Sequence, residues 1–195
     1  MIDDYYESAA VATYPVTLVE VKLWCKVAHI TEDALLNSLI TAATAKAELI
    51  TNRLLISRTV TGYFSSLDCS KYEKGYHITI RRAPVTAVAT VKIMIDDVLE
   101  TIEATEYNLK HTGGFPRIIF EEVNDSPDCV PYPYQVAFTA GYGAAAVVPE
   151  AIKTAIKETI TYWYRNRGDC TSGNMEIPPI AMGILGEYRI LNTFA

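Results

Sequence analysis

The stretch Tyr134-Gln-Val-Ala-Phe-Thr-Ala140 alternates large apolar with smaller or polar residues, and Gly141-Tyr142-Gly143 follows it directly. This alternation predicts a half-buried β-strand. The two glycines supply a turn, because glycine adopts positive φ without steric cost. Pro149 then starts an amphipathic helix that we expect to reach Arg167, since the first helical residue needs no N–H donor. Local chemistry therefore predicts a strand, a turn and a helix in succession.

Helices are predicted at both ends of the chain. Thr17-Leu-Val-Glu20 is a capping box that starts a short helix ending near Ala28. Thr31 is placed to cap a second helix, extending to about Arg53, with two acidic residues in its first turn. Pro178-Pro179 precedes a last short helix from Ile180 to Tyr188. These segments predict a helical bundle built from both ends of the sequence.

The second helix carries an apolar stripe in steps of three and four, which indicates one buried face. Its members are Leu36, Leu39, Ile40, Ala43, Ala47, Ile50 and Leu54. Alanines at 42, 43, 45 and 47 leave a slim surface that suits close helix packing. That packing is possible within the subunit or between subunits, and the sequence leaves both open.

Between the helices, from Thr59 to Ala140, the hydrophobic period changes from 3.6 to two. The longest alternating run, Val85 to Ile95, ends at a predicted turn at Asp96-Asp97. We therefore expect an α+β protein in which an antiparallel β meander is inserted into a helical bundle. The predicted division is a flexible arm at 1–15, a single domain at 16–188 (helices 16–57, β lobe 58–146, helices 147–188) and a tail at 189–195.

The chain has 195 residues, of which half are hydrophobic and 21% are charged, the balance of a folded globular protein. Its net charge is −6, and the segment from Asp96 to Asp128 holds nine acidic residues against two basic ones. No cluster of Lys and Arg is dense enough to bind the phosphates of a nucleic acid tightly. We therefore expect at most transient, non-specific contact with DNA. We expect a protein without a signal peptide or membrane span.

Sequence motifs for catalysis or metal binding are absent: there is no GxSxG, GxxxxGK[ST] or HExxH. The four cysteines lie about forty or more residues apart, which fits reduced thiols rather than a zinc knuckle. We expect no cofactor, no metal and no enzymatic activity. A small enzyme whose site is assembled from scattered carboxylates and tyrosines stays open as an alternative.

Several short motifs, in a fixed order, resemble those of one family. They are the Pro15-Val-Thr-Leu-Val-Glu20 opening, Glu32-Asp-Ala-Leu-Leu36, Ile80-Arg-Arg-Ala-Pro-Val85, Glu106-Tyr-Asn-Leu109, Phe138-Thr-Ala-Gly-Tyr-Gly143, Val148-Pro149, Trp163-Tyr-Arg-Asn-Arg167 and the segment from Ile177-Pro178 to Tyr188-Arg-Ile190. Together they are similar to the head-tail connector proteins, also called adaptor or head-completion proteins, of long-tailed bacteriophages and gene-transfer particles. The resemblance spans about Val16 to Ile190. Arg82-Ala83-Pro84 carries less proline than the family motif at that point, and the two ends of the chain have no counterpart.

This resemblance implies a structural protein of the virion neck, assembled in the cytoplasm of the bacterial host. Such proteins form a homo-oligomeric ring, commonly of twelve subunits, between the portal protein and a head-closure (stopper) or tail protein. DNA passes through the channel of the ring. A minor capsid or tail-terminator protein is the alternative within the structural class.

Two sets of contact residues are predicted on this basis. Apolar residues of the C-terminal segment have no apolar partner nearby in the sequence, so they are expected to dock on the portal: Leu185, Tyr188, Arg189, Ile190, Leu191 and Phe194. The alanine-rich helix and the Trp163 helix are candidates for the ring contact, through Ala43, Ala47, Trp163 and Tyr164. The acidic segment 96–128 is expected to repel phosphate if it lines the channel.

Overall fold

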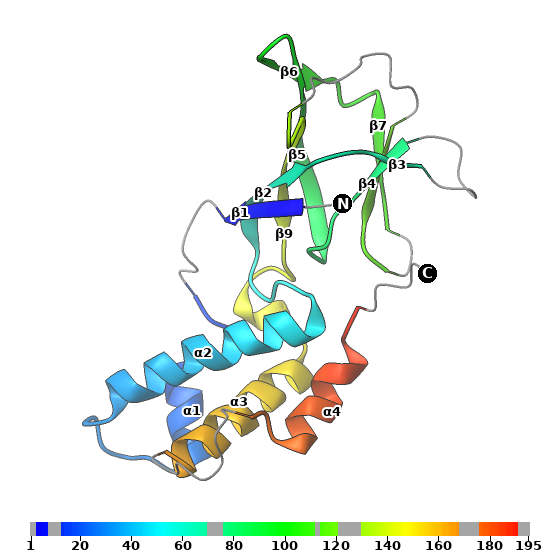
Figure 1. Cartoon of the computed structure of the whole chain (residues 1–195). Helices are drawn as coiled ribbons and strands as arrows, with labels where there is room; N and C mark the ends of the chain where they lie inside the picture. The colour runs from blue at the N-terminus through cyan, green and yellow to red at the C-terminus, as the bar shows by residue number, and fades with distance from the viewer. Residues whose placement is uncertain are drawn as a thin grey trace. The chain divides into compact units, whose positions relative to one another are not determined.

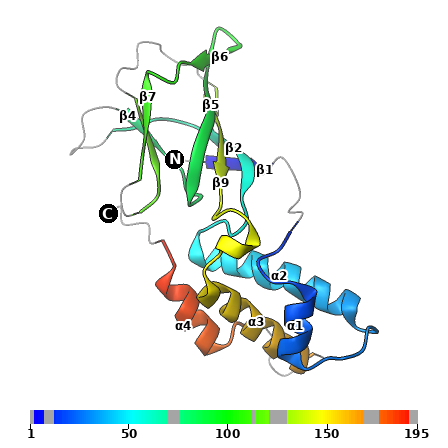
Figure 2. The ribbon, with the colours of Figure 1, turned by 180° about the vertical axis from the view of Figure 1, so that it is seen from behind.

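A computed structural model describes residues 3–7, 13–69, 76–111, 114–120, 130–167 and 176–190. The chain forms two compact units, and the fold class is α+β, as predicted (Figures 1 and 2). The helical unit contains Val11–Ile56 and Tyr142–Ile190. The β unit contains Met1–Ala10, Ser57–Gly141 and Leu191–Ala195.

The helical unit is built from four α-helices, α1 (Leu18–Cys25), α2 (Asp33–Thr51), α3 (Glu150–Arg165) and α4 (Pro179–Glu187), with a 3₁₀ turn, η1 (Ala145–Val147). Helices α2 and α3 pack against each other. Both views place α1 and α4 on opposite sides of this central pair (Figures 1 and 2). The unit is therefore a layer of helices with two different outer flanks.

The core of the helical unit is the set of apolar side chains on the inner faces of these helices. It contains Val16, Val21, Leu36, Ile40, Ala43, Ala47, Leu55, Ile56, Val148, Ile152, Ala155, Ile156, Ile160, Trp163, Ile177, Ala181 and Leu185. All of them belong to the helical unit. The periodicity of the sequence predicted the α2 members of this set, which are Leu36, Ile40, Ala43 and Ala47.

The β unit holds two antiparallel sheets. The five-stranded sheet has the order β1-β2-β9-β5-β6, with β1 (Asp3–Glu7), β2 (Arg58–Phe64), β9 (Tyr134–Ala140), β5 (Val85–Ile95) and β6 (Val98–Ile102). The four-stranded sheet has the order β3-β4-β8-β7, with β3 (Asp68–Cys69), β4 (Tyr76–Thr79), β8 (Arg117–Phe120) and β7 (Tyr107–Lys110). The strands of this lobe are antiparallel, as predicted, and they divide between two sheets, a division that the sequence did not predict.

Strand β9 is the centre of the larger sheet and shows the predicted alternation, with Tyr134, Val136, Phe138 and Ala140 buried. It pairs with β2 on one side and β5 on the other. Both glycines of the following turn have positive φ, 129° at Gly141 and 127° at Gly143, which confirms their predicted role.

Three local predictions differ from the structure at β5, β1 and the start of α2. Ala87 and Ala89 of β5 are exposed, because register shifts after Val85 and Val88 interrupt the strict alternation. Asp3–Glu7 of the predicted flexible arm form strand β1, which pairs along the edge of β2. Helix α2 begins at Asp33 without a side-chain cap, so Thr31 does not cap it.

Two further differences concern α3. The helix begins at Glu150, with Pro149 as the residue before its first turn, and ends at Arg165. Lysine side chains usually face solvent, but Lys153 is buried, and its Nζ lies 2.7 Å from Oε1 of Glu150. The lysine stem packs while its charge is paired with an exposed carboxylate.

Candidate functional site

No described helix is long and apolar enough to cross a membrane. Within the described ranges, no three His, Cys, Asp or Glu side chains are grouped so as to hold a metal ion. Two surface features of the described residues stand out: a cluster of polar side chains and two helix faces with exposed apolar side chains.

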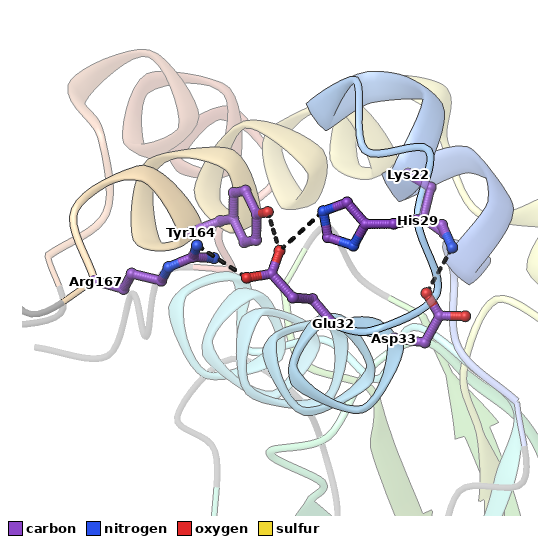
Figure 3. Close-up of polar contacts among 6 residues, drawn as sticks. All are labelled: Lys22, His29, Glu32, Asp33, Tyr164 and Arg167. Carbon is purple, nitrogen blue, oxygen red and sulfur yellow. Dashed lines mark hydrogen bonds and ion pairs between the residues drawn. The ribbon is translucent and has the colours of Figure 1, made fainter.

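The polar cluster joins the start of α2 to the end of α3 (Figure 3). The Tyr164 hydroxyl donates a hydrogen bond to Oε2 of Glu32, and Nη2 of Arg167 lies 2.9 Å from Oε1 of the same carboxylate. His29 Nε2 is 3.7 Å from Oε2. The Tyr164 hydroxyl is the main cause of a lowered pKa at Glu32, with further contributions from Arg167 and His29. Glu32 is therefore held as a carboxylate.

This cluster fixes the loop between α1 and α2. Lys22 of α1 forms an ion pair with Asp33 of α2, with 2.6 Å between Nζ and Oδ1 (Figure 3). Arg167 also stacks over the ring of Tyr164, 4.4 Å from its centroid. Because Glu32 precedes the first turn of α2 and is bound from α3, the cluster positions the α1–α2 loop against the end of α3. That loop carries the exposed side chain of Ile30.

Helix α1 has apolar side chains on two faces. Val21 points into the core, whereas Val19 and Leu23, one turn apart, are strongly exposed. Trp24 is partly exposed, with Nζ of Lys157 4.9 Å from its ring centroid. A helix that is apolar on both sides is usually covered on both sides. The outer face of α1 is therefore a candidate contact surface.

Helix α4 presents a second exposed apolar face, on the other flank of the unit. Ile180 and Gly183 share this face, and Met182 and Gly186 are exposed on a neighbouring side of the helix. Sequence reasoning missed this face and that of α1. The signal was present in α1, whose apolar residues do not follow a single helical stripe.

The predicted docking residues do not form one exposed patch. Leu185 and Ile190 are buried within the helical unit, so their side chains are not available as portal anchors in this fold. The backbone here is bound to the end of α2: Arg53 Nε donates to the Tyr188 carbonyl at 2.7 Å, and Ile190 N–H donates to the Thr51 carbonyl at 3.0 Å.

Tyr188 is half-buried and Arg189 is exposed, so both side chains have solvent-accessible surface that a partner protein can contact. Leu191 and Phe194 lie outside the described residues. The sequence predicted that Leu185 and Ile190 contact the portal protein, because the residues that bury them within this chain lie far away in the sequence.

The predicted ring-contact residues are mainly core residues. Ala43 and Ala47 are buried, and Trp163 is buried with its Nε1–H donating to the Glu176 carbonyl at 3.0 Å. Tyr164 is half-buried and bound to Glu32. Ala43, Ala47 and Trp163 therefore pack within the subunit in this structure, and their role in the ring contact stays a prediction.

The surface of the β unit is acidic around the β5–β6 hairpin. Asp96 and Asp97 form its turn, both with positive φ, as the sequence predicted for a turn at this point. Glu100 on β6, and Glu103 and Glu106 beyond it, are exposed. The remaining acidic residues of the segment lie in residues 121–129, outside the described residues.

One comparison with known proteins identifies a family. The model of a family described as "Head completion protein" matches residues 16–191. No curated protein matches the sequence.

The chain is also similar to chains in three solved structures of gene transfer agent (GTA) particles. For "Neck of empty GTA particle computed with C6 symmetry" the TM-score is 0.74 and the identity 22%, with 98% of this chain and 97% of the other covered. For "Virion of native gene transfer agent (GTA) particle" the values are 0.75 and 21%, with 97% of each chain covered. For "Neck of native GTA particle computed with C12 symmetry" they are 0.68 and 22%, with 98% and 97% covered.

These likenesses in structure extend over both units of the chain and concern the fold. The family match rests on the sequence, and it covers nearly all of the helices and strands described above. This chain therefore belongs to the head completion protein family.

Proposed function

We propose that this chain is a non-enzymatic structural protein of the phage neck, assembled in the cytoplasm of the bacterial host. It forms a ring that joins the portal vertex of the DNA-filled head to the head-closure (stopper) or tail proteins. The observation that carries the proposal is membership of the head completion family over residues 16–191. The likeness of the fold to chains in particle necks supports it.

The proposed ring is a homo-oligomer, and twelve subunits are the expected number. One of the similar neck structures was computed with C12 symmetry and another with C6, and twelve subunits are compatible with both. A ring requires two different, mutually complementary patches on each subunit, because head-to-tail contacts close into a cycle. The two outer flanks of the helical unit are surfaces of this kind.

The portal-docking role is proposed for the C-terminal segment, through Tyr188 and Arg189 together with Leu191 and Phe194. Leu185 and Ile190 are buried, so their part is to fix the segment on the helical unit. Because Ile190 donates a backbone hydrogen bond to Thr51, a truncation should keep Ile190. Removing residues 191–195 should abolish binding to the portal protein and leave the melting temperature unchanged, whereas unchanged binding would remove this part of the proposal.

Passage of DNA through the ring is proposed with the acidic segment facing the channel. Exposed carboxylates on the β5–β6 hairpin would repel phosphates and keep the DNA from adhering. An image of the assembled neck tests this directly. If the carboxylates of Glu100 and Glu103 lie on the outer rim of the ring, the electrostatic role is refuted.

Mass measurement with purified portal protein tests the function as a whole. The chain should join the portal ring in a complex with about one subunit of this protein per portal subunit. Particles produced without this chain should fail to acquire tails and should lose their packaged genome. Normal tailed particles in its absence would refute the proposal.

A further inference from the structure

The outer face of α1 is the most exposed apolar surface of the helical unit. Val19, Leu23 and Ile30 keep 67%, 75% and 80% of their surface exposed. Val19 and Leu23 are one helical turn apart, so they share a face, and Ile30 follows in the loop held by the Glu32 cluster. Three large apolar side chains exposed in one short segment indicate a surface that a partner covers.

The outer face of α4 differs from that of α1, because it carries two glycines beside an exposed isoleucine. Ile180 is 70% exposed, and a Cβ atom added at Gly183 or Gly186 would meet no heavy atom of the described chain within 4 Å. Glycine destabilises a helix interior relative to alanine. Packing within the described chain therefore does not require these two glycines, and they leave a low surface next to Ile180 into which large side chains of a partner fit.

The charges around the two faces favour one direction of packing. On α1, exposed Glu20 lies toward the beginning of the helix and exposed Lys26 follows its end. On α4, exposed Glu176 precedes the helix, and the exposed side chains of Glu187 and Arg189 at its other end have opposite charges. Antiparallel packing brings Lys26 toward Glu176, whereas parallel packing brings Glu20 toward Glu176, where two carboxylates repel each other. Antiparallel helix dipoles favour the same direction.

We propose that α1 of one copy docks antiparallel on α4 of the next copy, and that this is the contact that closes the ring. The inference rests on the proposed ring function and names its interface. Helices α1 and α4 lie on opposite flanks of the helical unit in both views, and a head-to-tail contact needs two separate surfaces on each subunit (Figures 1 and 2). In this direction Leu23 of one copy lies toward Ile180 and Gly183 of its neighbour, and Val19 lies toward Gly186.

Assembly of the full chain with purified portal protein, followed by mass photometry and electron microscopy, tests the contact. Leu23→Glu places a charge in the interface, and Gly183→Leu fills the low surface. Both should reduce the share of subunits in rings at least tenfold. Leu49→Glu, at a leucine of α2 that is also 70% exposed, is the matched control and should assemble as the wild type does.

Loss of folding is separated from loss of contact by Gly183→Leu. Leucine is a better helix former than glycine and meets open space at this position, so the free subunit should melt at the same or a higher temperature. Charge reversal tests the direction of packing: Lys26→Glu should weaken assembly, and the added change Glu176→Lys should restore it.

Each outcome decides the question. Wild-type ring levels in Leu23→Glu and Gly183→Leu would overturn the contact and leave the ring function intact. Rings that form but no longer hold the portal or tail proteins would show that these faces bind a different partner. Wild-type protein that forms no ring on the portal would refute the proposed function itself.

Discussion

At the scale of single residues, the ionisation of the Glu32 carboxyl group makes the stability of the protein depend on pH. Its pKa is lowered in the fold, chiefly by the Tyr164 hydroxyl, so folding favours the carboxylate. The stabilisation is complete above the unfolded pKa of about 4.3 and is lost as the pH falls through the lower folded value. Tyr164→Phe removes the donor and should destabilise the protein most at neutral pH.

Melting temperatures of the wild type and Tyr164→Phe, measured between about pH 7 and pH 4, check this prediction. The difference between them should shrink as the pH falls. Tyr162→Phe, at an exposed tyrosine of the same helix, is the control and should melt like the wild type throughout. A difference that is independent of pH would mean that Tyr164 acts by packing alone.

Three buried residues show which features of the fold the sequence alone does not predict. Leu185 and Ile190 were assigned to a partner because no apolar neighbour is close in the sequence, yet α4 packs on α3 and α2. Lys153 of α3 is expected on the solvent-facing side of its helix because of its charge, yet it is buried and paired with Glu150. The periodicity of a helix identifies its faces but does not say how many of them a fold will cover.

At the scale of elements, the first helix depends on its cap. Both halves of the capping box are present: Glu20 N–H donates to Thr17 Oγ1 at 3.2 Å and Thr17 N–H donates to Glu20 Oε2 at 2.6 Å. Thr17→Ala should lower the free energy of unfolding by about 1 kcal/mol, measured by urea denaturation. Ser38→Ala, in the interior of α2, should be neutral or slightly stabilising. Equal losses in both variants would contradict a specific role of the cap.

Helix α4 provides a second test, because its two sides have different neighbours. Leu185 is buried, so Leu185→Ala should cost about 2–5 kcal/mol of unfolding free energy. Met182 is exposed, so Met182→Ala should change stability by less than about 0.5 kcal/mol. Urea denaturation of both variants checks the difference. A stable Leu185→Ala variant that no longer binds the portal would restore Leu185 as a docking anchor.

Helices were predicted more completely than sheets for a physical reason. Caps and stripes are local, so α1 and α4 could be placed within about three residues of their ends. Strand pairing is not local: β2 pairs with β9, which lies far along the chain, and β1 pairs with β2. Alternation identifies a strand but not its partner, so neither the division into two sheets nor strand β1 followed from the sequence. The exposed faces of α1 and α4, which carry the proposed ring contact, were missed because exposure depends on this packing.

At the scale of the whole molecule, the β unit is an insertion in the helical unit. The chain leaves the helical unit at Ile56 and returns at Tyr142. Arg58 and Ala140, just inside these crossings, are paired partners in the sheet, so the two crossings lie close together. Among the residues that the structure describes, the core of the helical unit contains none from the β unit. These facts together predict that the helical unit folds without its insertion.

Replacing residues 57–141 with a Gly-Ser linker of about five residues should therefore give a helical protein that melts cooperatively. About 95 residues of the helical unit remain, enough for an independent core. Circular dichroism and binding of a hydrophobic dye check the result, and a gradual melt with strong dye binding would show that the core needs the β unit. Since both proposed contact faces stay in the shortened protein, it should also retain self-association, and this should be lost again in Leu23→Glu. Self-association that survives that change would move the ring contact away from α1, whereas folding without any self-association would assign part of the contact to the β unit.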